Sequence, residues 1–263
     1  MNRRRTGLAN LRANFRIEWV VWIIAVAMLL WLVVYPVGML LIGSFRSGPP
    51  GVPSEFTLEN HKVFLDPQYW GAVGKSLLVS IGATVIAVLM GVPLAWFVAR
   101  TNAPFARTLE GLSIGTFLFT PLMGVVAWIL LASPKIGLLN TVAVALLGKP
   151  LFNIYSFGGY MWVLGIYYSP YPFLIVTGVL KSVDPTLEEA ARASGAGIWR
   201  TTWKITFPLA LPGILASAIL VAILSLGNFA IQAALGQGSK LQVLTYTIFR
   251  KVTSFPSDYA GAT

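Results

Sequence analysis

The residues best suited to a specific task lie in one short polar segment, 184–212, between two long apolar runs. Glu188 and Glu189 supply adjacent carboxylates near its start, and Ala190 and Ala191 follow at once. Small alanine side chains keep a helix narrow, so another surface can approach its backbone. Gly195 follows, where glycine permits the left-handed turn that ends a helix. The pattern predicts a short helix that a partner protein can contact.

Prolines and helical periodicity divide this segment into two helices. Asp184 can cap free backbone N–H groups, and the proline after it suits a first helical position. A second helix is expected over 197–205, ending at Ile205, because apolar residues recur there at helical spacing. Pro208 and Pro212 are expected to stop it before the next apolar run. Two short helices joined by a glycine turn would form a rigid knob protruding from a membrane.

The same segment has a second interpretation, as an amphipathic loop lying on the bilayer surface. Arg192, Arg200 and Lys204 would then face anionic lipid headgroups. The two interpretations differ in whether the loop meets a protein or lipid.

A polar stripe marks the last apolar run. Ser225, Asn228 and Gln232 stand at i, i+3 and i+7, so they share one face of a helix. Polar side chains in a membrane helix face protein or water rather than lipid. The stripe therefore either lines a substrate path or forms hydrogen bonds between helices.

Aromatic hydroxyls and prolines gather in the preceding apolar run, at residues 167–172. Pro170 and Pro172 should kink a helix there and free backbone carbonyls. Tyr168 and Ser169 are consequently candidates for a gate on a translocation path. A purely structural kink is the alternative.

Several other chemistries find no support. Residues 71–76 (GAVGKS) resemble a phosphate-binding loop, but Tyr69 stands where that pattern needs glycine. His61, the one histidine, is expected in a solvated loop, and with no cysteine present we assign no metal site. The apolar runs contain no Asp, Glu or His, which argues against an intramembrane enzyme and against a proton-coupled carrier. We assign no catalytic residue and no cofactor.

The composition indicates an integral membrane protein. Hydrophobic residues make up 56% of the chain and charged residues only 11%, against about 25% charged in soluble domains. A net charge of +10 could suggest nucleic acid, but the basic residues are scattered in loops that flank apolar runs, so lipid is the expected partner and nucleic acid is not.

Five apolar runs reach the length of about 20 residues that a membrane helix needs. They are residues 19–42, 76–98, 112–132, 159–180 and 213–235. We predict an all-α polytopic helical bundle with these five transmembrane helices and a sixth expected beyond Thr263. Residues 136–148 are too short to span and are expected to form an interfacial or re-entrant helix.

The distribution of basic residues predicts how these helices are oriented in the membrane. An arginine cluster (Arg3, Arg4, Arg5, Arg12 and Arg16) precedes the first run, which is too long for a secretory signal and is expected to stay uncleaved. The cluster predicts a cytoplasmic N-terminus, and alternation of the spans then places 184–212 in the cytoplasm.

On the second run, four small residues recur every fourth position and should allow close helix packing, including at a subunit interface; they are Ala83, Ala87, Gly91 and Ala95.

The spacing Glu189-Ala190-Ala191, Gly195, Ile205 and Pro208 resembles the EAA signature (EAA-x3-G-x9-I-x-LP) of membrane subunits of bacterial ATP-driven importers. Phe207 departs from its usual leucine. The resemblance extends from about residue 72 to the end of the chain, and over this length the chain is similar to type I importer permeases. It divides the chain into residues 1–71, with the first helix and an external loop, and 72–263, the importer domain with its coupling loop at 184–212.

This resemblance implies a set of partners and a location. The loop would dock into a dimeric cassette ATPase, with Glu189 and Gly195 most closely tied to docking. A second permease subunit, or a fused second half, would complete the pathway, and an extracytoplasmic binding protein would deliver the substrate. The chain would then reside in the bacterial inner membrane and would hydrolyse no ATP itself.

Within that family, the amino-acid sequences of residues 152–191 and 227–236 are most similar to those of ferric-iron-type permeases, which implies iron as substrate. Thiamine, polyamine and aminoethylphosphonate permeases share much of this sequence similarity. A secondary transporter and a non-transporting membrane scaffold are the rival functions, and a scaffold would not need the knob at 184–212.

Overall fold

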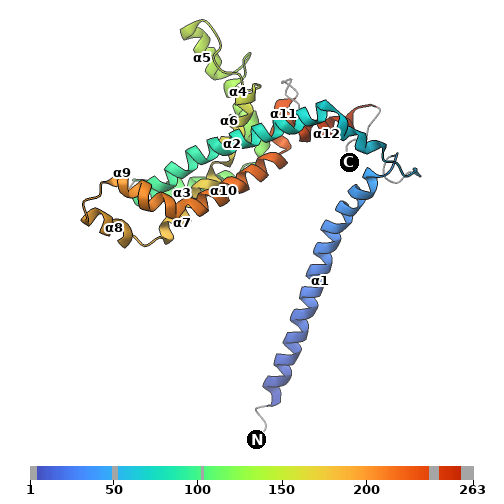
Figure 1. The fold of residues 1–263 in the computed structure, drawn as a ribbon, viewed down its shortest axis with the longest axis horizontal. Coiled ribbons are helices and arrows are strands. Elements are labelled where there is room, and N and C mark those ends of the chain that lie inside the picture. The colour runs from blue at the N-terminus through green and yellow to red at the C-terminus, as the bar shows by residue number, and fades with distance from the viewer. Residues whose placement is uncertain (1–4, 49–52, 102–103, 237–242, 256–263) are drawn as a thin grey trace. The chain divides into compact units, whose positions relative to one another are not determined.

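The computed structural model describes residues 5–48, 53–101, 104–236 and 243–255, with residues 5–17 described by their helix alone. Arg3 and Arg4 lie outside these residues. The chain forms two compact units, one of residues 1–66 and 251–263 and the other of residues 67–250. The described chain is mainly helical, which confirms the predicted all-α class (Figure 1).

The first unit contains the helix α1, Arg5–Ser44, and the short 3-10 helix η1, Glu59–Leu65. Residues 18–44 of α1 are long and apolar enough to cross a membrane, and their most apolar stretch is not buried inside the chain. Such a surface is stable when lipid covers it. An antiparallel bridge between Arg46 and Phe56 closes the loop that follows.

The second unit is built around α2, Pro67–Arg100. This helix begins nine residues before the predicted run and contains the whole of 71–76, so that segment is helix and not a phosphate-binding loop. The small-residue stripe is fully buried. A Cβ on Gly91 would lie 2.7 Å from the backbone oxygen of Ser169, so the stripe serves packing within this chain, against the element that carries Ser169.

Two predicted spans are bent where a proline follows the break. The run 112–132 consists of α3 (Ala106–Gly115), η2 (Thr116–Leu118) and α4 (Pro121–Ala132), with a bend of 102°. The predicted span is therefore interrupted and is not one continuous helix, because Pro121 cannot donate the hydrogen bond that continuation needs. The run 159–180 consists of α6 (Phe157–Tyr168) and α7 (Pro170–Ser182), bent by 41°. The kink predicted at this point is confirmed.

The last run is also interrupted. Helix α10, Phe207–Gly227, ends before Asn228, and α11, Ala230–Gly236, follows. The expectation of one continuous helix over 213–235 is therefore wrong, and the i, i+3, i+7 argument for the polar stripe does not apply across the break. A further helix, α12 (Leu244–Thr253), lies outside the five predicted runs.

The segment expected to be too short to span contains α5, Leu138–Leu147. Asn140, buried in this helix, donates to the carbonyls of Ser133 and Phe152 and accepts from the N–H groups of Leu151 and Phe152. One amide therefore satisfies four backbone groups and fixes the loop around α5.

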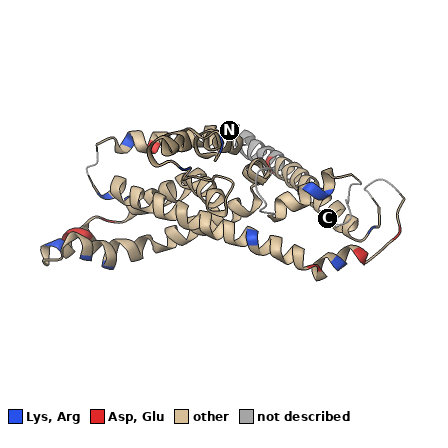
Figure 2. Cartoon of the chain, turned by 90° about the horizontal axis from the view of Figure 1, so that it is seen from above, with Lys and Arg blue, Asp and Glu red and all other residues tan. Residues whose placement is uncertain are grey.

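The membrane-spanning count follows from helix length and composition. Three helices of the described chain qualify alone, at residues 18–44, 67–100 and 198–227, and the total reaches five if each bent pair crosses once. In the unit 67–250, α2 packs against α6, α7 and α10. Charged side chains gather mostly at loops and helix ends, leaving long uncharged stretches of helix (Figure 2). This distribution fits a polytopic membrane bundle.

Candidate functional site

The predicted knob exists as a helical hairpin at one end of the long helices of the second unit (Figure 1). Its first helix is α8, Thr186–Ala193. Asp184 caps the start, because its carboxylate accepts the backbone N–H of Thr186 at 2.9 Å. The same hydrogen bond holds the pKa of Asp184 below its ordinary value. The Asp-Pro start signal in the sequence is therefore confirmed.

The end of α8 is a Schellman turn. The N–H of Ala196 donates to Ala191 and that of Gly195 donates to Arg192, at 3.0 and 2.9 Å. Gly195 has φ +84°, the left-handed region that side chains other than glycine rarely adopt. The predicted glycine turn is confirmed. It ends α8 and turns the chain toward the second helix of the hairpin.

The face of α8 predicted to meet a partner is largely uncovered. Glu189 and Ala190 are exposed and Ala191 is partly exposed. Gly195, at the tip, is exposed as well. Acidic and small residues thus lie on an accessible surface of a fixed hairpin, as docking requires.

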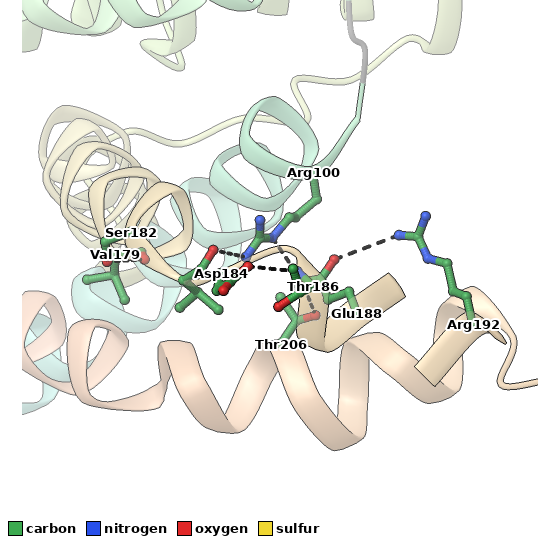
Figure 3. Close-up of polar contacts among 9 residues, drawn as sticks. Arg100, Val179, Ser182, Asp184, Thr186, Glu188, Arg192 and Thr206 are labelled. Atoms are coloured by element: carbon green, nitrogen blue, oxygen red, sulfur yellow. Dashed lines mark hydrogen bonds and ion pairs between the residues drawn. The ribbon is translucent and has the colours of Figure 1, made fainter. Parts of the chain in front are cut away.

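Glu188 has a different position from the one expected. Its side chain is only 7% exposed, and its Oε1 lies 2.9 Å from Nε of Arg100, at the end of α2. The hydroxyl of Thr206 donates to the same oxygen at 2.8 Å, and Nη2 of Arg192 lies 3.7 Å from Oε2. Figure 3 shows these contacts converging on the carboxylate. Glu188 therefore anchors the hairpin from inside and is not part of its exposed face.

The second helix of the hairpin does not stop at the prolines. Helix α9, Ile198–Thr201, passes into a π-helical turn, Thr202–Thr206, and then into α10 without a break. The expectation that Pro208 and Pro212 end it is wrong. The π turn lies directly before Pro208 and accommodates it, because such a turn already departs from regular i→i−4 hydrogen bonding. Membrane helices also tolerate an internal proline such as Pro212. Ile205 lies partly buried within the π turn.

Large aromatic side chains surround this entry to α10. Trp199 and Trp203 are 76% and 61% exposed, and with Trp96 they help to line an apolar groove of about 860 Å³. Tryptophan is enriched where helices cross from water into lipid. This suits a helix that enters the bilayer just after the hairpin.

The candidate pathway residues meet where two spans are broken. Tyr168, at the end of α6, accepts a hydrogen bond from Nδ2 of Asn228 at 2.8 Å and donates to the carbonyl of Leu224 at 3.2 Å. Asn228 also accepts from the N–H of Ile231 at 3.0 Å and so caps α11. We call this contact between the breaks the tyrosine junction. Tyr168 and Asn228 come together in it although they lie on different elements.

A third break joins the same place through the neighbouring tyrosine. The hydroxyl of Tyr167 donates to the carbonyl of Phe119, which lies between η2 and α4, at 3.0 Å. Ser169 is partly buried, and its hydroxyl donates to the carbonyl of Ile166, three residues earlier. The tyrosine junction therefore links all three interrupted spans.

The rest of the polar stripe is buried beside this junction. Ser225 and Gln232 are each 1% exposed, and Nε2 of Gln232 donates to the carbonyl of Ser225 at 3.4 Å. Among the described residues, Oγ of Ser225 and Oε1 of Gln232 are buried polar atoms without a hydrogen-bond partner. Buried polar atoms of this kind are commonly satisfied by ordered water.

His61 is less exposed than the solvated loop position expected for it. The imidazole packs against Phe45 with ring centroids 4.9 Å apart and is partly buried rather than fully solvated. Across the described residues, no three acidic or histidine side chains gather in a way that could hold a metal ion.

The comparison with protein families identifies the class. Residues 69–252 match the family of the binding-protein-dependent transport system inner membrane component. The chain therefore belongs to this family, the permease subunits of binding-protein-dependent importers. The match contains the α8 hairpin and the tyrosine junction.

Individual relatives cover most of the chain. The spermidine/putrescine transport system permease protein PotB of Salmonella typhimurium (strain SL1344) is 29% identical over 230 residues, which cover 84% of this chain and 79% of that protein. The protein of the same name from Escherichia coli (strain K12) is 30% identical over 222 residues, covering 81% and 80%. The molybdenum transport system permease protein ModB of Escherichia coli (strain K12) is 32% identical over 173 residues, covering 64% and 71%.

Solved structures share the fold. A bacterial ABC transporter involved in the import of the acidic polysaccharide alginate gives a TM-score of 0.70 at 14% identity, covering 96% of this chain and 90% of that one. An amino acid ABC transporter with histidines gives 0.53 at 20% identity, covering 77% and 85%. The names of the sequence relatives refer to polyamines and molybdenum, so the ferric-iron expectation finds no support in them.

Sequence reasoning missed two features of this site. Arg100 stands 88 positions before Glu188 in the chain, and no local pattern links them; the one available signal was a charged residue at the end of an apolar run. Thr206 falls within the signature, but nothing in that pattern indicates that its hydroxyl donates to Glu188.

Proposed function

We propose that this protein is a translocation subunit of an ATP-driven importer and that the α8 hairpin docks into a separate cassette ATPase dimer. The observation that carries this proposal is the exposed face of Glu189, Ala190 and Ala191 on a helix ended by the left-handed Gly195. A surface of this kind accepts close contact, because small side chains let another backbone approach and the carboxylate offers a charged hydrogen-bond acceptor.

The other expected partners belong to the same proposal. A second permease subunit, or a fused second half, completes the pathway, and an extracytoplasmic binding protein delivers the substrate. The N-terminus and the α8 hairpin lie on the cytoplasmic side of the inner membrane, where ATP is available. Belonging to a binding-protein-dependent transport family supports each of these partners.

The test is co-purification in mild detergent from native membranes. The tagged chain should bring down a cassette ATPase, and a Glu189→Lys, Gly195→Val variant of equal membrane abundance should lose it. Glu55→Lys is the matched control, because it reverses one exposed charge in the first unit, far from the hairpin in sequence. An inserted wild-type chain that brings down no ATPase would contradict the proposal and favour a secondary transporter or a scaffold.

We infer further that the substrate is a polyamine. Support comes from the permeases named for spermidine and putrescine, which align with 81% and 84% of this chain. The tyrosine junction, with Ser225 and Gln232 buried beside it, adds uncharged hydrogen-bond groups near aromatic rings that can attract an ammonium group.

Uptake by whole cells tests this inference. Labelled spermidine should enter cells that express the complete importer and should be displaced by putrescine. Excess ferric iron, molybdate, thiamine or aminoethylphosphonate should leave the uptake unchanged. Uptake of one of these four in place of spermidine would overturn the polyamine assignment and leave the importer assignment intact.

A further inference from the structure

We propose that Arg100, Glu188 and Thr206 form a clamp that positions the coupling hairpin, so that displacement of α8 by the ATPase moves α2 and α10 together. Arg100 ends α2, Glu188 lies in the first turn of α8, and Thr206 ends the π turn that leads into α10. This inference rests on the proposed docking of α8 and assigns residues that the docking face itself does not include.

The geometry of the clamp joins three elements through one carboxylate oxygen. Oε1 of Glu188 lies 2.9 Å from Nε of Arg100 and accepts the Thr206 hydroxyl at 2.8 Å. Arg100 also donates through Nη2 to the carbonyl of Val183, just before α8, at 3.4 Å. Arg100 thus holds both the approach to α8 and its first turn (Figure 3). These contacts leave little freedom for α8 to tilt independently of α2.

The three side chains of the clamp are buried, so their contacts are shielded from water. The Arg100 and Glu188 side chains are 10% and 7% exposed, and Thr206 is 3% exposed. Apolar residues could fill the same space with equal stability, since desolvation offsets much of the attraction in a buried ion pair. The hydrogen bond from the Thr206 hydroxyl fixes the orientation of the Glu188 carboxylate. The charge of Arg100, whose Nε lies 2.9 Å away without donating a hydrogen bond, holds that carboxylate at the end of α2.

The clamp adjoins the surface that a partner would touch. A polar recess of about 350 Å³ is lined by Arg100, Thr101, Glu188, Glu189 and Arg192, together with Ala99 and Pro185. Glu189 belongs to the exposed docking face and is the next residue after Glu188. A partner that displaces Glu189 therefore also displaces Glu188. Arg192 is half exposed, and its Nη2 lies 3.7 Å from the second carboxylate oxygen of Glu188.

Beyond the clamp, packing carries the motion into the bundle. Helices α2 and α10 contact each other and both contact α7, and the hydroxyl of Ser80 on α2 donates to the carbonyl of Ala222 on α10 at 2.7 Å. The π turn bearing Thr206 is a local departure from α-helical hydrogen bonding, of the kind that often marks functional positions.

The experiment uses the complete importer, with its ATPase and binding protein, reconstituted in proteoliposomes. Glu188→Gln keeps the size of the side chain and removes its charge. We expect the ATPase to stay bound and to hydrolyse ATP, while substrate uptake per ATP falls by about tenfold. The control is Glu110→Gln, which neutralises an acid of the more exposed pair Lys181–Glu110 and should leave uptake per ATP unchanged.

Two further variants separate positioning from folding. The exchange Arg100→Glu with Glu188→Arg should recover more uptake per ATP than either single change, because it restores the pair in reverse. Thr206→Val removes only the hydroxyl and should lower uptake per ATP less than Glu188→Gln. It provides the same test if Glu188→Gln does not reach the membrane.

A distance measurement tests the clamp without any activity. The chain has no cysteine, so spin labels at Leu94→Cys and Ala193→Cys report on α2 and α8 alone. The distance distribution should broaden in Glu188→Gln and stay narrow in Glu110→Gln. Unchanged distances together with unchanged uptake per ATP, in a variant that binds the ATPase, would overturn the clamp while leaving docking intact. Failure of the wild-type chain to bind any ATPase would instead refute the proposed function.

Discussion

The clamp at the α8 hairpin and the tyrosine junction among the broken spans join helices by different chemistry. The clamp uses a buried ion pair between Arg100 and Glu188, supported by a hydroxyl. The tyrosine junction uses only uncharged groups, with Tyr168 bonded to Asn228 and to a backbone carbonyl freed near a helix break. Both connect elements that are distant in sequence.

The difference follows from the surroundings of each contact. A charged side chain is costly inside hydrocarbon, so buried carboxylates are found near the water boundary or with a functional partner. Hydroxyls and amides can bond deep in a membrane, and each such bond is worth only about 0.6 kcal/mol on average. Removing one member of a buried ion pair costs about 3–5 kcal/mol, because the other charge is left uncompensated. We therefore expect the clamp to be rigid and the tyrosine junction to rearrange readily.

The largest effect should come from Gly195→Val, which breaks the hairpin that the clamp positions. Valine at φ +84° is strained, by about 1–2 kcal/mol for the left-handed backbone alone, so the turn should change and transport should be lost. Membrane insertion should be largely retained, because no span is touched. Uptake and membrane abundance are the measurements.

Gly197→Val is the matched control for that change. Gly197 has an ordinary φ of −70°, and a Cβ added there would meet no heavy atom within 4 Å, so uptake should stay close to wild type. Equal uptake by the two valine variants would show that the left-handed turn is not required.

Gly91→Ala tests the helix packing next to the tyrosine junction, independently of the clamp. The new Cβ would lie 2.7 Å from the oxygen of Ser169 and 2.8 Å from the nitrogen of Phe173, so α2 must move away from the start of α7. We expect a loss of about 1–3 kcal/mol, seen as a lower Tm in detergent. Gly74→Ala on the same helix meets nothing within 4 Å and should unfold like wild type; a Gly91 variant with the Tm of that control would contradict this packing.

Asn228→Leu should have a smaller effect on stability and a selective effect on transport. The change removes the bond to Tyr168 and the cap of α11, at an expected cost below about 2 kcal/mol. Uptake kinetics should change while ATPase co-purification does not. Normal uptake kinetics would assign Asn228 to packing alone, and a lost ATPase would mean that the tyrosine junction and the hairpin are not separable.

Asp184→Ala should have the smallest effect, limited to fraying at the start of α8. The carboxylate cap stabilises the helix above the unfolded-state pKa, and this contribution is lost as the pH falls through the lower pKa of the folded state. The cap is therefore complete at neutral pH. Asp184→Asn retains an acceptor and should couple ATP to uptake better than Asp184→Ala; identical coupling in the two variants would show that this cap does not matter.

Local rules predicted those parts of the site whose cause is local. The helix start at Asp184 and the left-handed turn at Gly195 follow from neighbouring residues, and both are found. The same rules failed at Pro208, because a π turn absorbed the proline, and at Asn228, where an apolar run concealed a break. A hydropathy run records solubility in lipid and carries no information on whether its helix is continuous.

The sequence by itself determined the membrane class, the approximate spans and the exposed half of the hairpin, since each depends on composition or on residues within a few positions of one another. Only the tertiary structure decided that Glu188 faces inward to Arg100 and Thr206, and that Tyr168 meets Asn228 across two broken helices. These pairs are separated by many residues, and which of many polar groups meet is set by helix packing, because the bundle brings together groups that no local spacing relates.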